Sequence, residues 1–182
     1  MGRPKLLLPW GNSTVIGHLL VQWRSLGAEQ IGVVCAEGDR DLRLELERSH
    51  LPSQDWIFNP VPEQGMFSSI QCAARWLGWQ AGLSHWVIVL GDQPHLRAET
   101  LRHLLRFAAA NPECVCQPTR TQRPRHPVVL PKSVFVQLAS SSASVLKTFL
   151  SNYSVAYCEL DDPGLDLDID TPEDYSAARG LA

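Results

Sequence analysis

The sequence lacks the features that mark several large classes of protein. It has no apolar run long enough to span a membrane and no signal peptide, so a cytoplasmic protein without membrane contact is expected. Its 16 basic and 19 acidic residues give a net charge of −3. The basic residues are scattered, which argues against a nucleic-acid-binding surface. Internal repeats, low-complexity tracts and linkers are also missing.

Cysteine is present, but not in a pattern that indicates disulfides or zinc. The five cysteines are odd in number and lie mostly in apolar runs, which is typical of reduced thiols. Cys114 and Cys116 are two residues apart, as on one face of a strand. A second Cys/His pair with zinc-site spacing is missing, so core packing is the better interpretation of these two cysteines.

Apolar runs alternate with amphipathic segments along the whole chain. The run Trp86–Leu90 is followed by the turn residues Gly91-Asp92-Gln93-Pro94, which is typical of a strand buried on both faces of a sheet. This alternation predicts an α/β fold: a single domain over residues 1–182, with a mostly parallel twisted sheet flanked by helices, as in Rossmann-like folds.

Asp92 is the first candidate for chemistry. Pro94 ends the strand and Gly91 permits a tight turn, so Asp92 is expected just past the carboxyl end of the strand. Ligands bind at that edge in open α/β sheets, and a carboxylate there suits Mg²⁺ and, through it, a phosphate chain. The alternative is that Asp92 merely caps the turn or the following helix.

A second acidic segment lies near the end of the chain. In Asp166-Leu167-Asp168-Ile169-Asp170 the carboxylates alternate with apolar residues, so an extended backbone would place all three on one face. Three like charges on one face suggest a bound cation. Part of the acidity that follows belongs to helix capping in Thr171-Pro172-Glu173-Asp174. Asp92 and Asp168 are expected to converge on one metal ion.

Two further segments offer polar groups, each with a structural alternative. Lys5 stands between Pro4 and Pro9 and could carry a fixed positive charge for a polyphosphate, although on this residue alone a solvated lysine is the better explanation. Ser68 and Ser69 are expected near a helix N-terminus, where free N–H groups favour anions. Capping alone would account for one of the two serines.

Five segments together resemble the MobA-like NTP transferases, in particular the molybdenum cofactor cytidylyltransferase branch. The matching residues are, in chain order, Met1–Pro9, Asn59-Pro60 with Gly65–Ile70, Gly91–Pro94, His126–Val128 and Asp168–Asp174. The resemblance implies a nucleotide-diphospho-sugar transferase-like α/β fold. It also implies transfer of a nucleoside monophosphate from CTP or GTP to molybdopterin, with release of pyrophosphate.

The resemblance also implies roles for individual residues. Lys5 would contact the triphosphate, and Asp92 with Asp168 and Asp170 would hold Mg²⁺ as the cofactor. The residues expected to help bind the nucleotide or the pterin are Arg3, Asn59, Gly65, Ser68, Ser69 and His126. A recipient molybdoenzyme or its chaperone would be a further partner.

Two departures from the family pattern keep other interpretations open. The family places a strand and a Gly-rich loop ending in Arg before the Met1 motif, so we expect a gap between the strands at Ile31 and Trp86. Arg123-Pro124-Arg125 stands before His126, where the family usually has a glycine. The alternatives are a nucleotidyltransferase for another phosphorylated acceptor, such as a sugar phosphate, and a non-catalytic molybdopterin-binding chaperone of a molybdoenzyme.

Overall fold

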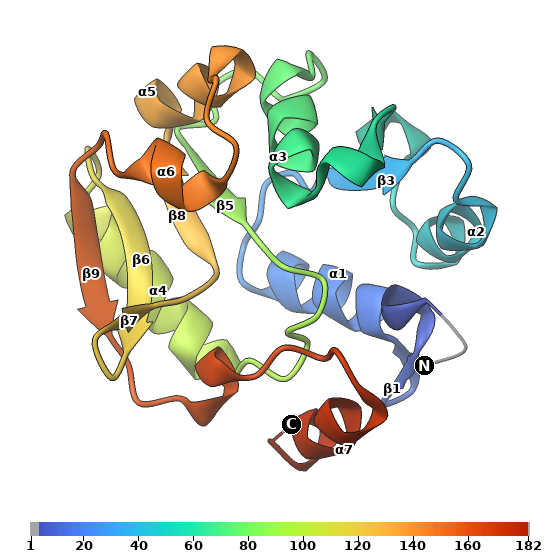
Figure 1. Cartoon of the computed structure of the whole chain (residues 1–182). Coiled ribbons are helices and arrows are strands. Elements are labelled where there is room, and N and C mark those ends of the chain that lie inside the picture. The colour runs from blue at the N-terminus through green and yellow to red at the C-terminus, as the bar shows by residue number, and fades with distance from the viewer. Residues whose placement is uncertain (1–3, 182) are drawn as a thin grey trace.

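The computed structural model describes residues 4–181, in which helices pack around a two-stranded and a five-stranded sheet, with a small separate hairpin near the start of the chain (Figure 1). The helices are α1 (Val15–Ser25), α2 (Arg40–Arg48), α3 (Met66–Arg75), α4 (Ala98–Ala110), α5 (Lys132–Phe135), α6 (Leu146–Leu150) and α7 (Pro172–Leu181). The strands are β1 (Pro9–Trp10), β2 (Ser13–Thr14), β3 (Val33–Ala36), β4 (Trp56–Asn59), β5 (His85–Ile88), β6 (Val115–Arg120), β7 (Arg123–Pro124), β8 (Val128–Pro131) and β9 (Val155–Glu159). Short 3₁₀ turns are η1 (Lys5–Leu7), η2 (Ser53–Asp55), η3 (Pro62–Gln64), η4 (Val136–Ser140) and η5 (Pro163–Asp166).

The strands confirm an α/β fold but pair in a more mixed way than the sequence suggests. β3 pairs with β4 in parallel, and β9 pairs with β6 in parallel. β8 lies between β5 and β6 and runs antiparallel to both, so the expectation of a mostly parallel sheet needs correction. The reason is the short connection from β6, which reverses at Thr121 and Gln122, both with positive φ. A parallel return would need a crossover of a dozen or more residues.

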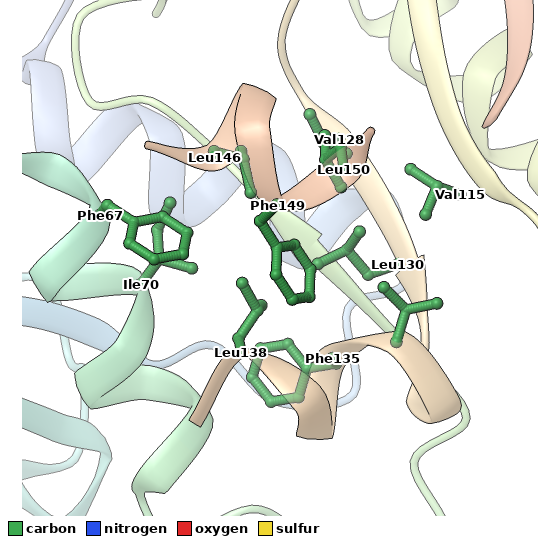
Figure 2. Packing of buried hydrophobic residues seen from close by; sticks show 11 residues of the cluster. Phe67, Ile70, Val115, Val128, Leu130, Phe135, Leu138, Leu146, Phe149 and Leu150 are labelled. Carbon is green, nitrogen blue, oxygen red and sulfur yellow. The ribbon is translucent and has the colours of Figure 1, made fainter. Parts of the chain in front are cut away.

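Both faces of the larger sheet are covered by helices, and alternate strand residues point to opposite faces. One face packs against α3, α5, η4 and α6, where Val128 and Leu130 meet Phe135 and Phe149 (Figure 2). The other face packs against α4 and the end of α1, and here Val129 and Cys116 are buried. β8 is buried along its whole length because it has a strand on each side and a helical layer on each face.

The apolar spacing after Gly11 predicts a helix from Gly11 to Leu26, but α1 begins only at Val15. Residues 9–14 instead form the small β1–β2 hairpin, which turns at Gly11 with a φ of +56°. The side chain of Thr14 then caps α1 by accepting a hydrogen bond from the N–H of Gly17 at 3.1 Å. This hairpin contacts the last helix, because Tyr175 of α7 donates a hydrogen bond to the carbonyl of Pro9. The two ends of the described chain therefore lie side by side (Figure 1).

β3 and β5 are not paired with each other, and a cavity of about 820 Å³ separates them. We call this cavity the slot; residues 27–34 line it on the β3 side and residues 84–91 on the β5 side. β5 is only half-buried, which corrects the expectation of a strand buried on both faces.

Two further expectations concern the described residues as a whole. The five cysteines are free thiols, as predicted. Cys116 is buried in the core and Cys114 packs half-buried against the same cluster, which agrees with core packing for this pair. Within residues 4–181, none of the helices combines the length and the apolar composition needed to cross a membrane.

Candidate functional site

Asp92 lies in the turn that follows β5, at the carboxyl end of that strand. The turn approaches the start of the chain closely, because a Cβ built on Gly91 would stand 2.5 Å from Cδ2 of Leu6. Only the end of the flexible Leu6 side chain would have to move to admit a side chain at this position. The contact between Gly91 and Leu6 places η1 against the turn that carries Asp92.

The segment around Asp168 lies beside this turn, although 75 residues separate Gln93 from Asp168. The N–H of Ile169 donates to the carbonyl oxygen of Asp92 at 3.1 Å, which joins the two backbones. The Nε2 of Gln93 donates to Oδ1 of Asp168 at 2.8 Å. Ile169 itself is buried with Trp10 and Val15, and this anchors the segment. The structure thus places Asp92 and Asp168 on neighbouring segments, and their binding of one metal ion stays a prediction.

Lys5 completes a compact group of charges. Its ammonium forms an ion pair with the carboxylate of Asp170, and this hydrogen bond raises the pKa of Lys5. The charges of Asp92 and Asp168 raise the pKa of Lys5 further. Lys5 is therefore fully protonated at neutral pH. Three carboxylates face one ammonium here, so the group as a whole favours an additional cation.

Asp92 is the member of the group whose charged form is disfavoured by its surroundings. Burial raises the pKa of its carboxyl, and the neighbouring charge of Asp168 raises it further. Within residues 4–181, its Oδ1 is buried and has no hydrogen-bond partner. A buried carboxylate oxygen without a donor is costly, so this oxygen is suited to a cation.

The oxygen ligands that the protein offers fit a hard divalent ion that binds to only two protein carboxylates. Across the described residues, no three acidic, histidine or cysteine side chains come close enough together to hold a metal ion on their own. Asp170 is held by Lys5, so it does not join Asp92 and Asp168 as the sequence predicted. Mg²⁺ is commonly bound by one or two carboxylates, with waters and substrate phosphates as its other ligands. The pair Asp92 and Asp168 matches that requirement.

Asp166 does not share a face with Asp168 and Asp170. It lies in the 3₁₀ turn η5, where its carboxylate pairs with Arg120 and Arg125. The hydrogen bond from Arg120 is the main reason that the pKa of Asp166 is lowered. The expectation of three aligned carboxylates assumed an extended backbone from residue 166 onward, and the η5 turn removes that alignment.

Asn59, Gly65, Ser68 and Ser69 come together as a second group, between the end of β4 and the start of α3. The side-chain amide of Asn59 donates to Oγ of Ser68 at 2.8 Å and to Oγ of Ser69 at 3.0 Å. Ser68 in turn donates to the carbonyl of Gly65 at 2.8 Å, at a position where a φ of +85° favours glycine. Asn59 and Ser68 are buried, so their polar groups shape this loop from within. No hydrogen bond among residues 4–181 joins them to Asp92.

His126 lies close to the first group. The backbone of Ile88, at the end of β5, and the charge of Asp168 both act to raise the pKa of its ring. Burial is the main cause that lowers the pKa of His126, so the imidazole is neutral at neutral pH. Arg3, the remaining residue of the predicted site, lies outside the described residues.

Two polar residues that support this site were missed by sequence reasoning. Gln93 is 4% exposed and holds Asp168, and its place directly after Asp92 was the available signal. His18 on α1 faces the same turn, and the backbone of Pro94 acts to raise the pKa of its ring. The pKa of His18 is lowered mainly by burial, so its imidazole is also neutral at neutral pH. No pattern in the sequence links His18 to residue 94.

Comparison with known proteins agrees with this geometry. The family model described as the MobA-like NTP transferase domain matches residues 1–156. The chain belongs to the MobA-like NTP transferase family. A curated relative, the molybdenum cofactor cytidylyltransferase of Escherichia coli (strain K12), is 24% identical over 183 residues, covering 98% of this chain and 88% of the relative. The chain is thus a nucleotidyltransferase, and Asp168 lies beyond the stretch that the family model matches.

Solved structures of similar fold include one that holds a divalent metal. Rv0371c from Mycobacterium tuberculosis H37Rv is 25% identical, with a TM-score of 0.77, covering 99% of this chain and 90% of that one. Its complex with manganese is 25% identical, with a TM-score of 0.71, covering 98% and 93%. A protein of this similarity therefore accepts a divalent cation.

Proposed function

We propose that this MobA-like nucleotidyltransferase joins CMP from CTP to the terminal phosphate of molybdopterin and releases pyrophosphate, with Mg²⁺ bound at Asp92 and Asp168. The observation that carries the proposal is the buried, unpartnered Oδ1 of Asp92 beside Asp168 and Lys5. The printed name of the Escherichia coli relative supports cytidine as the nucleoside and the molybdenum cofactor as the acceptor.

The protein's own residues position and neutralise phosphate groups. The ammonium of Lys5 would hold the triphosphate, whose negative charge competes with Asp170 for it. Gln93 would keep the carboxylate of Asp168 oriented toward the same phosphates. When bound, Mg²⁺ would offset the charge on the phosphate oxygens.

No side-chain nucleophile is required by this reaction. An oxygen of the terminal phosphate of molybdopterin forms a bond to the α-phosphorus of CTP, and the bond from that phosphorus to the bridging oxygen of pyrophosphate breaks. Catalysis then rests on alignment and charge stabilisation, which are the main contributions of proteins to such transfers. Neutral His126, near Asp168, is placed to contact the nucleotide or the pterin without adding charge. The product would pass to a recipient molybdoenzyme or its chaperone.

The test is pyrophosphate release from each of the four ribonucleoside triphosphates, with molybdopterin or a sugar phosphate as acceptor and with and without Mg²⁺. We expect release with CTP, molybdopterin and Mg²⁺, and a dinucleotide product by mass spectrometry. Asp168→Asn should abolish it. Asp166→Asn is the matched control, because Asp166 lies two residues away on the same loop but pairs with Arg120 and Arg125.

The outcomes separate the parts of the proposal. Release with a sugar phosphate but not with molybdopterin would overturn the acceptor, and release with GTP alone would overturn the nucleoside. Equal activity in the Asp168→Asn and Asp166→Asn variants would overturn the metal site.

A further inference from the structure

Residues 92–100 and residues 162–169 lie side by side and run in opposite directions, and we call this pair of segments the seam. At one end of the seam, the two hydrogen bonds described above join the turn of Asp92 to the segment of Asp168. This end brings two carboxylates together, and the charge of Asp168 raises the pKa of Asp92. Such repulsion acts to open the seam unless the rest of it holds the two segments in place.

The middle of the seam is held by a buried histidine. His95 is 2% exposed, and its Nε2 is hydrogen-bonded to the carbonyl oxygen of Gly164 at 3.0 Å. The two segments pack tightly here, because a Cβ built on Gly164 would stand 3.0 Å from Cδ2 of His95. Asp162 lies two residues before Gly164 and is itself buried, so the contact continues to the far end of the seam.

The carboxylate of Asp162 caps two helical turns at once. Its Oδ1 accepts a hydrogen bond from the N–H of Gly164 at 2.9 Å, which caps the η5 turn. Its Oδ2 accepts hydrogen bonds from Oγ1 of Thr100 at 2.6 Å and from the N–H of Arg97 at 3.4 Å. Arg97 is the N-cap residue of α4 and supplies no side-chain cap. A carboxylate from the other segment of the seam therefore takes the place of a local cap.

Burial makes Asp162 an unfavourable choice if filling space were its only purpose. Among residues 4–181 it forms no ion pair, so hydrogen bonds alone must offset the loss of water around it. An apolar side chain would fill the same space, but it would hold neither turn in a fixed orientation. The carboxylate thus fixes the start of η5 to the start of α4, and η5 ends two residues before Asp168.

We propose that Asp162 is a positioning residue for nucleotidyl transfer: by joining η5 to α4, it holds the segment of Asp168 against the turn of Asp92. Asp162 acts through these segments and does not touch the reacting groups. The inference rests on the function proposed above, because the two carboxylates that it positions form the proposed metal site. Loss of Asp162 frees the segment, and the repulsion between Asp92 and Asp168 then drives them apart.

The test compares Asp162→Ala with Asp39→Ala. Asp39 is the matched control because its carboxylate also caps a helix, by accepting a hydrogen bond from the N–H of Leu42 in the first turn of α2 at 3.1 Å. Both variants lose a helix cap, so both should have a lower melting temperature. Only Asp162→Ala removes a connection between the two segments of the seam.

Three measurements report on the end of the seam that carries Asp168. The first is hydrogen exchange at the amide of Ile169, with the amides of β6 as the reference for global unfolding. Relative to β6, Asp162→Ala should speed this exchange by about tenfold or more. The second is the NMR signal of the side-chain amide of Gln93, which should move toward that of a free amide. The third is calorimetric titration with Mn²⁺, in which affinity should fall by about tenfold or more. Asp39→Ala should leave all three unchanged.

A second pair of variants covers the case in which Asp162→Ala does not fold. Thr100→Val removes one of the three hydrogen bonds to Asp162, and Thr100→Ser keeps the hydroxyl group. Thr100→Val should change the three measurements in the same direction by a smaller amount, and Thr100→Ser should restore them.

The outcomes separate positioning from stability alone. A lower melting temperature with unchanged exchange at Ile169 and an unchanged Gln93 signal would overturn the proposal, because Asp162 would then only stabilise the fold. Equal changes in Asp39→Ala would overturn it as well. If the unmodified protein does not bind Mn²⁺, the metal site proposed above fails, while the exchange at Ile169 and the Gln93 signal still decide whether Asp162 positions the segment.

Discussion

Gln93→Met is expected to weaken binding of the divalent ion without unfolding the protein. Gln93 is 4% exposed, and its Nε2 donates to Oδ1 of Asp168 at 2.8 Å. Methionine has a similar length and no donor, so it would fill the space and leave Asp168 free to rotate. Asp168 is exposed, so water would replace the lost hydrogen bond at a small cost to folding.

The size of the effect follows from the kind of hydrogen bond that is lost. A hydrogen bond to a charged group contributes about 1.5–3 kcal/mol. If that energy is used to hold Asp168 in its binding orientation, its loss lowers metal affinity by about 10- to 100-fold. The effect on unfolding should stay near 1 kcal/mol, because the carboxylate regains its partner from solvent.

The assay is titration with Mn²⁺ by calorimetry, combined with thermal unfolding. The matched control is Gln71→Met, since Gln71 on α3 also donates from a part-buried amide but bonds the backbone carbonyls of Leu138 and Ser141. The control should lose a comparable amount of stability and retain its Mn²⁺ affinity. Equal Mn²⁺ affinity in the Gln93→Met variant and the unmodified protein would refute the reasoning.

Three further predictions concern the charged residues. Lys5→Ala should raise the KM for the nucleotide and lower kcat, because phosphate charge increases in the transition state; unchanged steady-state kinetics would show that Lys5 is merely solvated. Asp92→Asn should reduce pyrophosphate release by more than about 100-fold. It should also raise the melting temperature at neutral pH, because a raised carboxyl pKa means that the fold favours the protonated form and loses stability as pH rises through that pKa. A lower melting temperature would contradict that reading of Asp92. Asp166→Asn should lower the melting temperature at neutral pH by no more than about 4 °C. The melting-temperature difference between the variant and the unmodified protein should vanish as pH falls through the pKa of Asp166, which Arg120 and then Arg125 hold below its usual value. A melting-temperature difference that persists in acid would show that the ion pairs of Asp166 are not its cause.

The local pattern of the sequence was sufficient for most elements and for the general place of the site. The spacing of apolar residues in 98–110 predicts α4 with the bounds that the structure shows, because its buried face repeats at the helical period. Asp92 was predictable for a similar reason. A glycine and a proline flank it after an apolar run, and together they place a carboxylate at the end of a strand.

Contacts between distant parts of the chain decided the roles of the individual carboxylates. Asp166, Asp168 and Asp170 look equivalent in the sequence, yet one pairs with Arg120, one is held by Gln93 and one pairs with Lys5. These partners lie 46, 75 and 165 residues away, so no local pattern indicates which carboxylate faces the site.

Tertiary contacts also decided the direction of β8 and the half-buried state of β5. The apolar pattern of a strand reports that it is buried, but not which strand lies beside it. β8 is antiparallel because the turn at Thr121 is too short for a crossover. β5 stays half-buried because one of its edges faces the slot. The sequence by itself determined most of the segments that become helices and strands, since backbone preference and apolar period act locally. Only the folded chain decided which charges meet and which edges remain open, since those depend on partners far away in the sequence.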